Sequence, residues 1–122
     1  MVKVHYFFDP MCGWCYGATT LVEIIEKLTP FELIYHPGGM IAKQAIASSF
    51  RQHILHSDTL IAAQTGAIFG DAYKARLNST EPFVIDSYLP IRAILVGEEM
   101  GITPVITLKA IQQAHYQLGQ HY

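Results

Sequence analysis

Cysteine is scarce in this chain of 122 residues. Only Cys12 and Cys15 are present, and two residues separate them. A structural zinc site needs a full set of cysteine and histidine ligands. The chain has no second cysteine pair, and no histidine stands at a matching spacing near the first. These absences favour a redox-active pair over a metal site, with two inert buried thiols as the remaining alternative.

Charge is also sparse, and neither sign dominates. Charged residues make up 15% of the chain, and the net charge is −2. A nucleic-acid surface needs a basic patch, so we expect no nucleic-acid partner. No apolar run reaches the about 18 residues of a membrane-spanning helix, so we expect no membrane partner. The hydrophobic fraction of 51% is sufficient for a packed core.

The N-terminus lacks the features of a secretory signal. No charged segment is followed there by an apolar stretch and a small-residue cleavage site. We therefore expect a cytoplasmic protein, although a mature chain whose signal had been removed would look the same. Thiols are kept reduced in the cytoplasm, so a lone CxxC pair there is more often catalytic than structural.

Cys12 follows an expected strand at 2–8, and Cys15 lies in the first turn of an expected helix from Gly13 to about Leu28. Strand, CxxC and helix in this order are typical of a redox site. The first turn of a helix has unpaired N–H groups and a partial positive charge. We therefore expect the pKa of Cys12 to fall below its ordinary value of about 8.5. Cys12 is predicted as the attacking nucleophile, and the more buried Cys15 as the resolving thiol.

Three neighbours of the nucleophile are candidates for contacting the substrate or stabilising the thiolate: Met11, Gly13 and Trp14. Gly13 is expected to keep the approach to Cys12 open, and Trp14 to offer an apolar face. Neither of them ionises, so the thiolate is expected to be stabilised mainly by backbone donors and the helix dipole. No bound cofactor is required, because the dithiol is itself the redox centre.

The order Asp-Pro-Met-Cys-Gly-Trp-Cys-Tyr at 9–16 resembles the active-site segment of the DsbA-type thiol–disulfide oxidoreductases, in their cytoplasmic FrnE-like branch. Segments 37–40, 60–66, 69–73 and 114–116 agree with this resemblance, which covers nearly the whole chain. It implies an α/β, thioredoxin-like βαβ unit with an inserted all-helical domain. It also implies that Cys12 and Cys15 are catalytic, and that the partners are protein disulfides, protein thiols or glutathione.

The periodicity predicts a parallel βαβ unit whose second strand is 31–36 and whose first suits a buried central position. Helices are expected from Ser48 or Ser49 to 65, within 67–78, from 86 or 87 to 100, and from 104 to about 118. We therefore divide the chain into a thioredoxin-like part at 1–38 and a helical insertion domain at 39–122.

Pro104 allows two interpretations. It is either the first residue of a helix, which we favour, or a cis-proline followed by a strand, as in thioredoxin folds. A helix there leaves the C-terminal strands of the fold apparently missing, as in a chain truncated at its C-terminus. We then expect a homo-oligomer formed through the incomplete sheet edge, or a fragment with impaired activity.

Several other side chains are weaker candidates. His53 and His56 are more typical of surface histidines than of metal ligands. His36 is expected to end its strand rather than approach the cysteines, and Asp9 to form a turn with Pro10 rather than relay protons. Aromatic side chains are candidates for a substrate surface, although two of them are more often helix-packing residues; they are Trp14, Phe69 and Tyr73.

The predicted function is thiol–disulfide exchange through Cys12 and Cys15. The alternative is a non-catalytic binding or assembly module, or an inactive fragment of a DsbA-type protein. A glutathione-dependent transferase or isomerase ranks lower, because the related kappa-class transferases replace this CxxC. The sequence leaves open the substrate, the direction of electron flow and the natural length of the protein.

Overall fold

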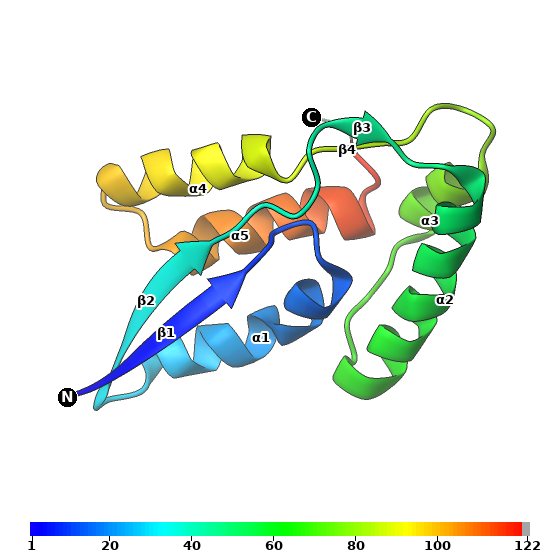
Figure 1. Ribbon diagram of the computed structural model, residues 1–122. Helices are drawn as coiled ribbons and strands as arrows, with labels where there is room; N and C mark the ends of the chain where they lie inside the picture. The colour runs from blue at the N-terminus through cyan, green and yellow to red at the C-terminus, as the bar shows by residue number, and fades with distance from the viewer. Residues whose placement is uncertain (121–122) are drawn as a thin grey trace.

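The chain begins with two parallel strands joined by a helix. β1 (Val2–Phe8) pairs with β2 (Phe31–Pro37), in a register that places Val2 opposite Phe31 and Phe8 opposite Pro37. α1 (Gly13–Lys27) connects them, as Figure 1 shows for the computed structural model, which describes residues 1–120. The predicted βαβ unit is therefore confirmed.

The two strands expose one face of their sheet. Phe8 is buried against Ile94 and Leu108, and Tyr6 and Tyr35 pack against the same cluster. Phe7 points the other way and is 73% exposed. The expected buried central strand is therefore wrong for the described residues, because the helices that pack on these strands cover one face.

Helices make up most of the remaining chain. They are α2 (Ser48–Thr65), α3 (Asp71–Asn78), α4 (Tyr88–Glu99) and α5 (Pro104–Gln112), which continues as the π-helical η1 (Gln113–Gln117). Gly66 ends α2 with a φ of 75°, as the sequence indicates. The predicted serine caps of α2 are wrong, because Ala47 is the N-cap residue and Ser48 already belongs to the helix.

Pro104 is the first residue of α5, so the helical interpretation is confirmed. Within residues 1–120 the only cis peptide bond is Thr29–Pro30. Two short strands were not predicted: β3 (Gln44–Ala45) pairs antiparallel with β4 (Val84–Ile85). Strands of two residues are too short to give a hydrophobic pattern, which explains why periodicity does not detect them.

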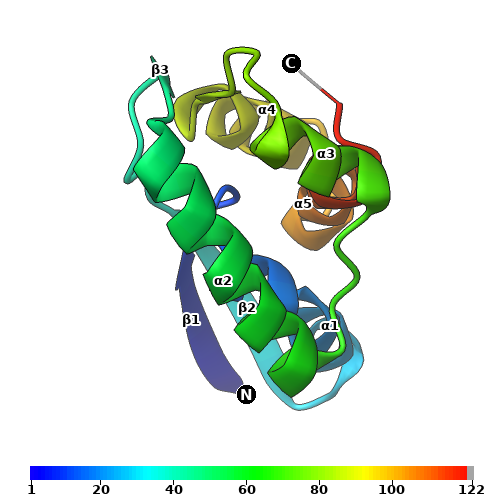
Figure 2. The same ribbon diagram turned by 90° about the vertical axis from the view of Figure 1, so that its right-hand side faces the viewer.

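The main hydrophobic core crosses the predicted division at residue 38. Met11 and Tyr16, from the first part, join buried side chains that extend to Tyr116. Figures 1 and 2 both place α2 beside the N-terminal end of α1. The division into 1–38 and 39–122 stays a prediction, and residues 121 and 122 lie outside the described residues.

The sheet of β1 and β2 has two strands in the part of the chain that the structure describes. The expected oligomer through this sheet edge stays a prediction. No helix within residues 1–120 combines the length and the apolar character needed to cross a lipid bilayer.

Candidate active site

Cys12 is the N-cap residue of α1. Its backbone is extended, with φ of −88° and ψ of 125°, and its carbonyl accepts the helical hydrogen bond from the N–H of Tyr16 at 3.0 Å. Its own N–H donates to the carbonyl of Asp9 at 3.1 Å. Cys12 and Cys15 are both half-buried free thiols. The sulfur of Cys12 therefore lies where the unpaired N–H groups of the first helical turn point.

These surroundings lower the pKa of Cys12 to about 6. The largest cause is a hydrogen bond from the thiol of Cys15, and the N–H groups of Cys15 and Trp14 add to it, while burial opposes them. The expectation that backbone donors contribute most to stabilising the thiolate is therefore wrong. The neighbouring thiol contributes more, because it is one helical turn away and points at the same sulfur.

The pKa of Cys15 is raised. It donates its proton toward Cys12, and burial adds to the effect. Tyr6 lies beside it: burial and the neighbouring Cys15 raise the pKa of that phenol. The Tyr6 hydroxyl is buried and has no hydrogen bond of conventional geometry among the described residues. Sequence reasoning missed this neighbour, because Tyr6 has the pattern of an ordinary strand residue.

Asp9 organises the loop before Cys12. Its side chain accepts hydrogen bonds from the N–H of Met11 at 2.8 Å, the N–H of Met40 at 2.8 Å and the hydroxyl of Ser87 at 2.9 Å. The residue is buried. The hydrogen bond from Met11 fits the predicted turn at Asp9 and Pro10. The bonds from Met40 and Ser87 connect this turn to distant parts of the chain. Because its oxygens are occupied by these donors, Asp9 is a structural acceptor.

A cavity of about 280 Å³ opens beside Cys12. The three predicted neighbours Met11, Gly13 and Trp14 all line it, and Trp14 is 46% exposed. Its remaining walls come from α2, from α3 and from the segments around β3, β4 and η1. The lining residues there are Met40, Ile41, Phe50, His53, Ile54, Ser57, Asp58, Ile61, Tyr73, Ile85, His115 and Tyr116. Most of these side chains are apolar. The geometry thus combines a stabilised thiolate with an apolar cavity at its side.

Gly13 has a packing role that the sequence did not indicate. A Cβ atom at this position would lie 2.8 Å from Cδ1 of Ile61 and 3.2 Å from Oδ1 of Asp58. Both neighbours belong to α2, so the missing side chain lets α2 approach the first turn of α1 closely. Gly13 therefore brings the wall of the cavity to the cysteines.

The weaker candidates lie mostly elsewhere. His36 shares a hydrogen bond of 2.8 Å with His5 and stacks on Phe7 on the exposed face of the sheet. Residues 1–120 contain no group of three or more potential metal ligands, so His53 and His56 form no such cluster. Phe69 is buried in the core with Tyr73, and of the two only Tyr73 lines the cavity beside Cys12.

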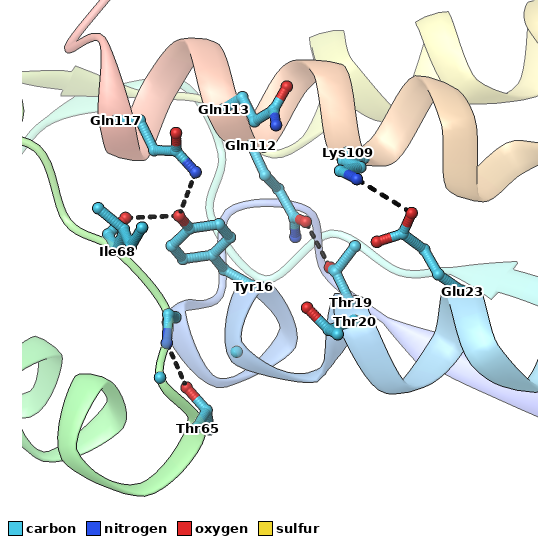
Figure 3. Close-up of a pocket in the computed structure, with 13 residues that line it drawn as sticks. Tyr16, Thr19, Thr20, Glu23, Thr65, Ile68, Lys109, Gln112, Gln113 and Gln117 are labelled. Atoms are coloured by element: carbon cyan, nitrogen blue, oxygen red, sulfur yellow. Dashed lines mark hydrogen bonds and ion pairs between the residues drawn. The ribbon is translucent and has the colours of Figure 1, made fainter.

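A second, polar cavity of about 160 Å³ lies along the flank of α1 (Figure 3). Tyr16 donates a hydrogen bond to the carbonyl of Ile68 and accepts one from the amide of Gln117 at 3.0 Å. Thr19 donates to Oε1 of Gln112. These contacts tie the helix that carries the cysteines to the end of the described chain.

Known proteins resemble this chain in structure. Neither the protein-family models nor the curated proteins give a match. The cytosolic disulfide reductase DsbM from Pseudomonas aeruginosa matches with 35% identity and a TM-score of 0.88. The match covers 98% of this chain and 57% of the DsbM chain. The fold of this chain is DsbA-like.

Two further solved structures support the DsbA-like assignment. DsbM with GSH matches with 38% identity and a TM-score of 0.86, over 98% of this chain and 57% of its own. A protein from Nitrosomonas europaea, described as a putative protein disulfide isomerase, matches with 25% identity and a TM-score of 0.75. This match covers 97% of the present chain and 56% of the Nitrosomonas chain. This DsbA-like chain thus spans less than two thirds of the length of these chains. The predicted α/β, thioredoxin-like fold class is confirmed.

Proposed function

We propose that this DsbA-like protein catalyses thiol–disulfide exchange through Cys12 and Cys15. The observation that carries the proposal is the N-cap position of Cys12, where the neighbouring thiol and two backbone N–H groups lower its pKa to about 6. A thiolate is the nucleophile of disulfide chemistry, and Cys12 is largely ionised at neutral pH. Cys15 stays protonated until it is needed, because its own pKa is raised.

The exchange then takes two steps. The Cys12 thiolate attacks one sulfur of the substrate disulfide, forming a mixed disulfide and releasing the other half as a thiolate. That thiolate takes up the proton that Cys15 loses. The Cys15 thiolate then attacks the sulfur of Cys12, breaks the mixed disulfide and releases the second half as a thiolate. Two electrons pass from the protein dithiol to the substrate, and the protein holds a Cys12–Cys15 disulfide.

Glutathione and protein disulfides are the proposed partners. One of the similar solved structures is that of DsbM with GSH, and the cavity beside Cys12 has room for a small thiol. Met11, Gly13 and Trp14 are proposed to border the bound substrate, because all three line that cavity. A cytoplasmic location is proposed because DsbM is described as cytosolic. The direction of exchange follows from the potential of the pair relative to its compartment.

A redox titration of the purified protein in glutathione buffers tests the proposal. Thiol alkylation and Trp14 fluorescence report the state of the pair. We expect a reversible two-electron transition that is lost in Cys12→Ser. Cys15→Ser is expected to accumulate a mixed disulfide at Cys12, because the resolving thiol is absent. A pair that forms no disulfide at any buffer ratio would overturn the proposal and favour the non-catalytic alternative.

A further inference from the structure

Asp58 presents a carboxylate oxygen to the CxxC segment. The residue belongs to α2 and is 6% exposed. Its Oδ1 lies 3.2 Å from the position that a Cβ of Gly13 would occupy. Asp58 and Cys12 line the same cavity. An acidic side chain from the helical segment is therefore placed beside the residue that follows the nucleophile.

The two oxygens of this carboxylate differ in their surroundings. Oδ2 accepts a hydrogen bond of 2.6 Å from the hydroxyl of Tyr73, whereas Oδ1 has no hydrogen bond within the described part of the chain. Burial raises the pKa of Asp58 to about 6, opposed by Tyr73 and by the charge of Lys74. A buried carboxylate is costly unless donors satisfy it. Oδ1 is thus an acceptor available to a molecule in the cavity.

The cavity offers no fixed positive charge to a ligand. Its described lining includes the ionisable side chains Cys12, His53, Asp58, Tyr73 and His115, and contains neither lysine nor arginine. A ligand carboxylate would therefore meet a thiolate and a carboxylate without a permanent cation to pair with. A ligand ammonium group would meet both of these anions.

Resting on the proposed thiol–disulfide exchange, we propose that Asp58 binds an ammonium group of the substrate. The preferred substrates are then small disulfides whose halves carry a positively charged amine near the sulfur, that is, aminothiol disulfides. The ammonium donates to Oδ1 of Asp58 while one substrate sulfur meets Cys12. Apolar side chains such as Ile54 and Ile61 exclude water around this ion pair and strengthen it. The volume of about 280 Å³ suits a small molecule.

Rate constants for two small disulfides of similar length test the proposal. The reduced protein is mixed with cystamine, whose amines are protonated, or with the neutral bis(2-hydroxyethyl) disulfide. The ratio of the two second-order rate constants is compared with the same ratio for dithiothreitol, which supplies the intrinsic reactivity. We expect the ratio of the cystamine rate constant to the bis(2-hydroxyethyl) disulfide rate constant to be higher for the protein than for dithiothreitol. Asp58→Asn should lower the protein's ratio by about tenfold, which corresponds to the loss of one charged hydrogen bond.

Asp71→Asn is the matched control. It removes an exposed carboxylate from α3 and is expected to keep the wild-type ratio. Any change in the Cys12 thiolate itself alters both rate constants and cancels in the ratio. An unchanged ratio in Asp58→Asn overturns the proposal. If that variant does not fold, the wild-type ratio decides, and a value equal to the dithiothreitol reference overturns it. A failure of both disulfides to oxidise the pair would instead overturn the proposed function.

Discussion

The hydroxyl of Ser87 donates a hydrogen bond of 2.9 Å to Asp9, 78 positions earlier in the chain. Ser87 is fully buried and is the N-cap residue of α4. It also accepts a hydrogen bond from the N–H of Ile41 at 3.2 Å. One serine thus joins the loop before Cys12, the segment after β2 and the start of α4.

Ser87→Ala is expected to destabilise the protein by about 1–3 kcal/mol, because a buried carboxylate oxygen and a backbone N–H each lose a partner. Urea denaturation measures this free energy of unfolding. Ser49→Ala, at an exposed position in α2, is the control and should change it by less than about 0.5 kcal/mol. Equal effects of the two substitutions would contradict the role assigned to the Ser87 hydroxyl.

The low pKa of Cys12 is expected to depend on Cys15. The rate of alkylation of Cys12 should rise with pH around a midpoint of about 6 in the wild type. Cys15→Ala removes the largest cause of the shift, so the midpoint should move up toward the ordinary cysteine value of about 8.5. Cys15→Ser retains a hydroxyl donor and should move it less. A midpoint that stays at the wild-type value in Cys15→Ala would show that backbone donors suffice.

Gly70→Ala is expected to be strongly destabilising. The N–H of Gly70 donates to the carbonyl of Tyr116 at 2.8 Å, and a Cβ there would overlap the backbone carbonyl of Gln117. Backbone atoms cannot rotate away as a side chain does, so we expect a loss of about 3 kcal/mol or more. Gly38→Ala meets no atom within 4 Å and is the control. Thermal unfolding of both variants tests the difference.

Asp58 gives stability a specific pH dependence. Its pKa is about 6 in the folded protein and about 3.9 in an unfolded chain. Between these values the folded state binds more protons than the unfolded state, so stability falls as pH rises through this window. Asp58→Asn lacks this component. The stability of the variant relative to wild type should therefore increase by about 1–2 kcal/mol from pH ~4 to pH ~7, as urea denaturation at both pH values measures. A constant difference would contradict the raised pKa.

Local signals predicted the elements that position the cysteines. Pro30 follows the end of α1, Gly66 ends α2 and Pro104 begins α5. Each of these residues favours a helix start or end through the backbone angles that it prefers. The redox pair is predicted for a similar reason, since the spacing of Cys12 and Cys15 and their place at the start of a helix are visible in the sequence. These features depend on neighbours along the chain.

The rest of the site depends on residues that are distant in sequence. Nothing near Asp58 indicates that α2 brings it to Gly13, because that approach follows from packing of the two helices. Two of the three hydrogen-bond partners of Asp9 lie 31 and 78 positions away. The open face of β1 was missed because its apolar residues suggested burial on both sides, whereas the described chain covers one.

Tyr16 directly follows Cys15, and its ring stacks on Tyr116 with the ring centroids 4.5 Å apart. Its hydroxyl is held by Ile68 and Gln117. The first turn of α1 is therefore anchored at the opposite end of the described sequence. A shortened version of this protein that stops before Tyr116 would keep both cysteines and the whole βαβ unit. It would nevertheless lose the ring contact and the hydrogen bond through which Tyr116 and Gln117 anchor the helix that carries them.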